Sequence, residues 1–171
     1  HTVIFVDEPY LTSLGTAFTA VPNEQVTSLL EVVFSGIEGL NGVHCCGSTD
    51  WSLLLKSSTD ILSFDAYNYA DSLSCYPAEV KAFLERGGNI AWGIVPNIEE
   101  ASVKESAASL YDRLGEAMAP FTREGVPFKQ LIAQGLLTPS CTLASMSREA
   151  ASRTLKLLAE LSATVRSKHS S

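Results

Sequence analysis

The chain has 171 residues, of which 46% are hydrophobic and 18% are charged, a balance typical of one globular domain with a full core. Its formal net charge of −7 argues against nucleic acid or an anionic membrane surface as a main partner. No apolar run reaches the length of a membrane span, and we expect no secretory signal. The four cysteines, two of them adjacent, do not resemble a disulfide framework, so we expect a cytoplasmic protein.

Short apolar segments alternate with helical patterns along the whole chain. Five of these segments predict strands, at residues 2–6, 42–46, 60–65, 89–96 and 135–141. The apolar run of the first segment fits burial on both faces, as in a parallel sheet. Strands separated by helices argue for a parallel sheet with helical crossovers, and therefore for one α/β domain over residues 1–171.

Helical patterns fill most of the segments between these strands. Pro22 and Asn23 open the first helix, with Asn23 as its expected N-cap, and Asp50 is the expected N-cap of the second. The helices are predicted at about residues 23–34, 51–56, 77–86, 102–121, 127–134 and 148–167. Loops are predicted at residues 10–21 and 67–69, and a frayed end at residues 168–171.

The second predicted strand carries two candidate metal ligands. Residues two apart on a strand point to the same face, so His44 and Cys46 project together while Cys45 faces the other way. An imidazole and a thiolate side by side are donors that Zn²⁺ prefers. Taken alone, the pair fits a packed histidine beside two buried thiols better than a metal site. Cys45 and Cys75 are expected to be structural or incidental.

The chemically active side chains share one position in the predicted fold. They lie at the C-terminal ends of the predicted strands, and they are Asp7, His44, Cys46, Asp65 and Cys141. Barrels of the (β/α)₈ type and open α/β sheets build their sites at that end of the strands. We therefore expect these residues to form one site.

Four motifs in one order give the chain a family resemblance. The motifs are Asp7-Glu8-Pro9, His44-x-Cys46, Ser63-Phe64-Asp65 and Pro139-Ser140-Cys141. Together they resemble the catalytic barrel of cobalamin-independent methionine synthase, which belongs with uroporphyrinogen decarboxylase and the corrinoid-dependent zinc methyltransferases. The resemblance covers residues 2 to about 161. It implies a Zn²⁺ ion held by His44, Cys46, Asp65 and Cys141, and a homocysteine amino group held by Asp7.

The chain departs from this family pattern in three places. Asp65 stands where the synthase has Glu, so its carboxylate is one methylene shorter. Thr142 stands where family members commonly have Gly. The segment Trp92–Asn97 lacks the histidine that is credited with acid catalysis in the synthase, and the other two histidines, His1 and His169, lie near the chain ends.

The length of the chain also bears on the resemblance. An eight-stranded barrel typically needs about 250 residues, whereas this chain offers five predicted strands. The resemblance therefore implies the C-terminal half of a TIM (β/α)₈ barrel, with the N-terminal strands absent. Half a barrel exposes two sheet edges, which favour association. We expect a homo-oligomer or a complementing N-terminal half.

The function implied by the resemblance is zinc-dependent methyl transfer to a thiol, most directly homocysteine to give methionine. The first candidate donor is methylcobalamin, supplied by a corrinoid protein, because its cobalt(I) leaving group needs no proton; the second is methyltetrahydrofolate. An isolated half-barrel is expected to be inactive. Two alternatives stay open, a non-catalytic zinc-binding or interaction module and a metal-free decarboxylase of the uroporphyrinogen type. The motif His44-x-Cys46 together with Cys141 argues against the decarboxylase.

Overall fold

The computed structural model of the protein describes residues 2–14 and 21–169. Within these residues, five parallel strands form one sheet in the order β1-β2-β3-β4-β5, so that each strand lies beside its neighbour in the sequence. The strands are β1 (Val3–Asp7), β2 (Leu40–Cys45), β3 (Ile61–Phe64), β4 (Asn89–Val95) and β5 (Gly135–Pro139). This sequential parallel order is that of a (β/α) barrel segment, and the predicted α/β class is confirmed.

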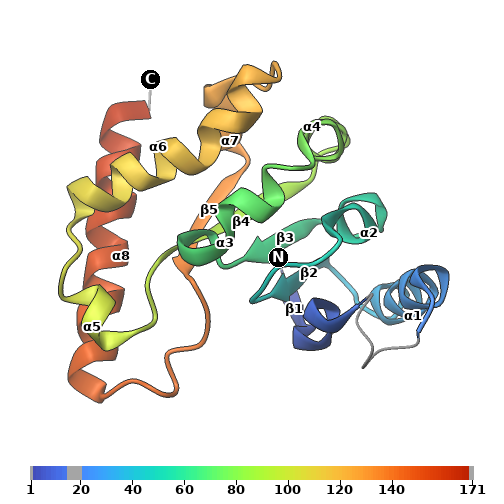
Figure 1. The fold of residues 1–171 in the computed structure, drawn as a ribbon, viewed down its shortest axis with the longest axis horizontal. Coiled ribbons are helices and arrows are strands. Elements are labelled where there is room, and N and C mark those ends of the chain that lie inside the picture. Colours follow the sequence, from blue (N-terminus) through green and yellow to red (C-terminus); the bar gives the residue numbers. More distant parts are fainter. Residues whose placement is uncertain (1, 15–20, 170–171) are drawn as a thin grey trace.

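Helices connect successive strands and follow the sheet from one edge to the other (Figure 1). They are η1 (Pro9–Ser13), α1 (Asn23–Ser35), α2 (Trp51–Lys56), α3 (Ala66–Leu73), α4 (Pro77–Glu85), α5 (Glu99–Ser102), α6 (Ala107–Arg123), α7 (Phe128–Ala133) and α8 (Arg148–His169). The main helices contact each other in turn, α1 with α2, α2 with α4, α4 with α6 and α6 with α8. The helices thus form one curved layer outside the sheet. None of the described helices is both long and apolar enough to cross a membrane.

One of the two predicted helix caps is confirmed. The Asp50 carboxylate accepts a hydrogen bond of 3.1 Å from the Ser52 backbone N–H at the start of α2. The prediction for Asn23 is wrong, because α1 begins at Asn23 itself and the extended residue Pro22 holds the cap position. The predicted loop at residues 10–21 contains η1 in its first part, and its residues 15–20 lie outside the described chain.

Two further boundaries differ from the sequence prediction. The predicted loop at residues 67–69 lies inside α3, which begins where the Asp65 carboxylate accepts a hydrogen bond from the Asn68 backbone N–H. The helix predicted at residues 102–121 begins later, as α6 at Ala107, and the short helix α5 that precedes it was not predicted. The chain breaks between them because Ser106 and Ser109 form a reciprocal capping box that starts a new helix.

The end of α8 is better ordered than predicted, since the helix continues to His169. The His169 Nε2 atom lies 2.9 Å from the Tyr111 hydroxyl, and the two rings are stacked at 6.1 Å. The Lys168 ammonium lies 3.9 Å from the centre of the same Tyr111 ring. These contacts attach the last turn of α8 to α6. His1, Ser170 and Ser171 lie outside the described residues.

The core lies between the sheet and the helix layer, and a row of aromatic rings runs through it. Trp51 on α2, Phe64 on β3 and Trp92 on β4 are each fully buried, and consecutive ring centres are 5.6 Å apart. Phe121 on α6 continues the row at 6.0 Å from Trp92. Edge-to-face pairs of this kind add about 0.5–1.5 kcal/mol each beyond the burial of their area. Trp92 therefore belongs to the core and does not form a pocket wall.

The opposite face of the sheet carries small side chains, and this leaves room for a site. A side chain at Gly42 on β2 would come within 2.5 Å of the Phe5 ring, which lies over this glycine from β1. A side chain at Gly93 on β4 would collide with the Phe64 carbonyl and approach the Ser140 Cα to 2.9 Å. Glycine at these positions therefore allows the neighbouring strand and the turn after β5 to come close.

Candidate metal centre

The register of the parallel strands brings the predicted site residues to one end of the sheet. Asp7 on β1 pairs with His44 on β2, and His44 pairs with Ser63 on β3. Cys46 follows the last residue of β2, and Cys141 follows the turn that ends β5. The four crossover connections therefore place residues that are up to 134 positions apart in the sequence on the same rim, as expected for the C-terminal ends of parallel strands.

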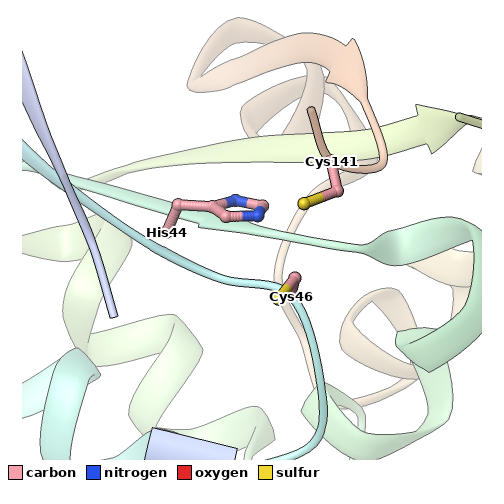
Figure 2. Close-up of side chains that lie close together, drawn as sticks. All are labelled: His44, Cys46 and Cys141. Carbon is pink, nitrogen blue, oxygen red and sulfur yellow. The ribbon is translucent and has the colours of Figure 1, made fainter. Parts of the chain in front are cut away.

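Three of these residues form a compact group. One ligand atom each from His44, Cys46 and Cys141 lies within 4.8 Å of the others, and the three side chains point toward one another (Figure 2). The ligands of a tetrahedral Zn²⁺ ion, about 2.0–2.3 Å from the metal, are roughly 3.3–3.8 Å apart, so small movements would bring these atoms to that spacing. Cys45 is fully buried in the core on the other face of β2, which confirms the predicted alternation.

The imidazole of His44 is held in an orientation suited to metal binding. Its Nδ1 atom lies 2.9 Å from the Ser63 hydroxyl. Its Nε2 atom is buried and has no hydrogen-bond partner among the residues that the structure describes. Metal-binding histidines usually share this arrangement, in which one ring nitrogen is fixed by a neighbour and the other is left for the ion. Burial lowers the pKa of His44 below its ordinary value, against the smaller opposing effects of Asp7 and Asp65, so the ring is a neutral ligand at pH 7.

The thiol of Cys46 is affected by its neighbour across the site. Burial raises the pKa of Cys46, and the approach of Cys141 raises it further. Two thiols this close cannot both ionise easily, because the two negative charges would repel each other. A bound cation would reverse this repulsion, so metal binding would release protons from the pair.

The turn that carries Cys141 is fixed to the end of β4. The Ser140 hydroxyl donates to the Asn97 side-chain oxygen at 2.9 Å and accepts from the Asn97 backbone N–H at 3.1 Å. The Asn97 amide also donates to the Thr142 carbonyl at 3.2 Å. A register shift between Gly93 and Val95 lies beside these contacts, and such irregularities commonly redirect a strand end near a site. Asn97 thus fixes the residues on both sides of Cys141.

The two predicted carboxylates occupy different places. Asp7 is exposed and faces the same cavity as His44. Asp65 is 5% exposed and does not belong to the compact group of three. Its two oxygens accept hydrogen bonds from the backbone and the side chain of Asn68, at 2.9 and 2.7 Å. Burial raises the pKa of Asp65, and its charge acts on both His44 and Cys46, so it lies close to the group.

A cavity of about 420 Å³ opens beside the group. Its polar wall contains Asp7, His44, Ser63 and Thr138 together with the two thiols, and its apolar wall contains Phe5, Pro9 and Pro139. A cavity of this size, apolar on one side and with a few polar groups on the other, can hold a small molecule.

The sequence analysis assigned no role to Ser63, Asn97 or Thr138. The sequence could have indicated Ser63 as a site residue, because it lies two residues before Asp65 on a predicted strand and so faces the same side. The sequence could not have indicated Asn97, since its contacts with Ser140 and Thr142 join segments more than 40 residues apart, which hydrophobic periodicity does not relate.

Comparison with known proteins gives one line of support for the fold. No protein-family model matches the chain, and no curated protein sequence matches it. A solved structure of a B12-independent methionine synthase from Shewanella sp. W3-18-1, in complex with selenomethionine, is similar with a TM-score of 0.65 and 19% sequence identity. The match covers 97% of this chain and 49% of that chain. The protein therefore has the fold of half of a methionine synthase-like barrel.

Proposed function

We propose that the chain is part of a zinc-dependent methyltransferase that acts on a thiol, most directly on homocysteine to give methionine. The observation that carries the proposal is the group of His44, Cys46 and Cys141, in which a buried imidazole nitrogen without a partner in the described chain faces two thiols. One nitrogen and two sulfur donors suit Zn²⁺. The similarity in fold to a methionine synthase supports the same reaction class.

The donor set suits a catalytic rather than a structural ion. Catalytic zinc sites keep three protein ligands and an open position, whereas structural sites have four protein ligands. His44, Cys46 and Cys141 would hold the ion, and the neighbouring cavity would provide the open position. Asp65 lies outside the group of three and is held by hydrogen bonds to Asn68, so it would have to move toward the ion to join them. Zinc bound here would supply one effect, which is to keep a thiol substrate deprotonated at neutral pH.

The surrounding residues have separate tasks in this proposal. Ser63 fixes the His44 ring through Nδ1, so that Nε2 stays directed at the site. Asp7 is an exposed carboxylate in register with His44, and it would accept a charge-assisted hydrogen bond from the ammonium group of an amino thiol. Phe5 and Pro139 offer an apolar wall for the carbon chain of that substrate. Together these groups orient a short amino thiol with its sulfur toward the cysteines.

The proposal also includes a partner for the sheet. The chain spans about half the length of the methionine synthase that it resembles, 49% of it. β1 and β5 are the two edges of the sheet in the described residues. We propose that a complementing N-terminal half or a second copy of the chain pairs with these edges, and that catalysis depends on it. The protein by itself would then bind zinc without turning over substrate.

Zinc content is the first test of this function. In metal analysis of the purified protein, Cys46→Ser and Cys141→Ser should each lose most of the bound zinc, because each removes one of three ligands. Cys75→Ser is the matched control, since Cys75 is exposed and lies outside the group, and it should keep the zinc. Full zinc occupancy in both ligand variants would overturn the metal site.

Zinc retained by the wild type without methyl transfer, even with the complementing half present, would favour a non-catalytic zinc module. Neither zinc nor activity would favour the decarboxylase.

The methyl donor is tested in the same assay by offering each donor separately to the complete barrel. Methylcobalamin is our first candidate, because in the described residues no histidine lies near the end of β4 to protonate a folate leaving group. General acids contribute roughly 10²–10⁴-fold to such steps. Methyltetrahydrofolate is the second candidate, supported by the B12-independent neighbour. Consumption of methyltetrahydrofolate alone would show that the missing histidine does not decide the donor.

A further inference from the structure

One side chain of β5 has an unusual environment in the cavity beside the metal group. The Thr138 hydroxyl oxygen is buried and has no hydrogen-bond partner in the part of the chain that the structure describes. Three side chains share this condition there, and two of them, His44 and Thr138, line the same cavity. A buried polar group left unpaired costs about 1–3 kcal/mol. Two such groups around one cavity indicate that a ligand completes their bonding.

Strand alternation directs Thr138 toward the cavity. Leu137 packs against the core on the helix side of the sheet, so Leu136 and Thr138 face the opposite side. Thr138 pairs with Gly93 on β4, and the absence of a side chain there lets the Phe64 carbonyl and the Pro139–Ser140 turn lie close over this glycine. The Thr138 side chain nevertheless lines the cavity, on the side of the sheet that carries His44 and Ser63.

The strand register also sets the level of Thr138 along the site. The pairs His44–Ser63, Ser63–Ala91 and Ala91–Leu136 form one row across the sheet. Cys46 lies two residues beyond His44 in this row, and Thr138 lies two residues beyond Leu136. Thr138 is thus level with the cysteine end of the cavity.

A threonine hydroxyl can donate one hydrogen bond, and a thiolate sulfur can accept one. The metal group would hold the sulfur end of a thiol, whereas the candidate partner of an ammonium group, Asp7, lies on β1 at the other edge of the sheet. The position of Thr138 therefore matches the sulfur end of the substrate. Hydrogen bonds to an ionised acceptor are about twice as strong as neutral ones, so this contact would favour the deprotonated thiol.

We propose that the Thr138 hydroxyl donates a hydrogen bond to the sulfur of the thiol substrate, and that Thr138 is a further residue that determines substrate binding at this site. The proposal rests on the proposed thiol function and adds a contact to it. It involves no covalent step, since the hydroxyl keeps its proton throughout. It also gives the unpaired hydroxyl a partner that the described protein does not supply.

The experiment measures thiol binding directly. The protein is loaded with Co²⁺ in place of zinc, and the visible absorption of cobalt is followed while homocysteine or ethanethiol is added. In Thr138→Val, which keeps the shape and removes the hydroxyl, the dissociation constant for both thiols should rise about tenfold. In Thr138→Ser, which keeps the hydroxyl, it should stay within about twofold of the wild type. Cobalt stoichiometry should be unchanged in both variants, because Thr138 is not one of the three ligands.

The other outcomes overturn the inference in distinguishable ways. Equal affinity of Thr138→Val and the wild type for both thiols would show that the hydroxyl makes no contact with substrate. If Thr138→Val weakens the binding of homocysteine and leaves that of ethanethiol unchanged, the hydroxyl contacts the amino acid end of the substrate and not its sulfur. A wild-type protein that takes up no cobalt, or whose cobalt spectrum ignores both thiols, would contradict the proposed function itself, and this inference would fall with it.

Discussion

The central strands and the first strand of this sheet are built differently, although they have similar apolar sequences. All four residues of β3 are buried, and six of the seven residues of β4 are buried. In β1, by contrast, none of the five residues is buried, and Val3, Ile4 and Phe5 are each more than 40% exposed, at 43%, 42% and 43%. Similar apolar residues are therefore buried in the middle of the sheet and exposed to solvent at its β1 edge.

This difference shows what the metal group depends on. His44 and Cys46 are positioned by β2, which pairs with a strand on both sides, and Cys141 is held by a turn bonded to the end of β4. The buried centre thus carries the candidate metal ligands. Asp7 and Phe5, which would contact substrate, belong to the exposed strand β1. The candidate metal ligands are therefore held by more of the surrounding structure than the two residues that would contact the substrate.

The largest expected effect comes from truncating the same residue type in the two regions. Phe64→Ala on β3 removes a fully buried ring from the aromatic row, and it should lower the free energy of unfolding by about 3–5 kcal/mol. Phe5→Ala on β1 removes a ring that is 43% exposed, and it should cost about 1 kcal/mol. Urea unfolding followed by circular dichroism gives both values. Equal losses would show that β1 is as well packed as the centre of the sheet.

The next effect concerns association at the exposed edge. Ile4→Lys on β1 places a charge on a strand whose outer edge has no partner in the described chain, and charges of this kind block edge-to-edge pairing. We expect it to weaken self-association, or binding to a complementing half, by about tenfold or more, as measured by sedimentation velocity. Val32→Lys on α1 is the control for the added charge, because Val32 is 70% exposed and lies on a helix and not on the edge strand. A wild-type protein that stays a single monomer at all concentrations, alone and with the complementing half, would contradict the proposed partner.

The sequence was sufficient for the parts of the fold that depend on periodicity. Apolar runs predict the five strands, and the structure has each of them within a few residues of its predicted bounds. Alternation along a strand predicts that His44 and Cys46 project together, and both belong to the compact group. The start of α6 was predicted about five residues too early, because the Ser106–Ser109 capping box begins this helix inside a segment whose pattern looks helical. The Asn97–Ser140 contact was missed because it depends on how two distant strand ends meet in space. Local chemistry predicts local structure, whereas side-chain contacts between distant segments need the fold.

The smallest effect is the pH dependence of stability that His44 adds to the buried centre. Burial lowers the pKa of His44 in the folded protein below the ordinary value of 6.5, which the unfolded chain regains. Below pH 6.5 the unfolded state therefore binds more protons than the folded state, and stability rises with pH wherever this holds. The metal-free protein should thus have the full contribution of His44 above pH 6.5 and lose stability as the pH falls through 6.5 toward the lowered folded pKa.

The measurement compares the wild type with His44→Gln, both in chelator, by urea unfolding between pH 8 and pH 5. Gln does not titrate in this range, and Asp7 and Asp65, the charges that act on His44, are present in both proteins. The wild type should lose more stability than the variant over this interval, at about 1.4 kcal/mol for each unit by which the pKa is displaced. If the two curves run parallel, His44 is accessible to water in the folded protein, and the contrast between a buried metal group and an exposed first strand does not hold at this residue.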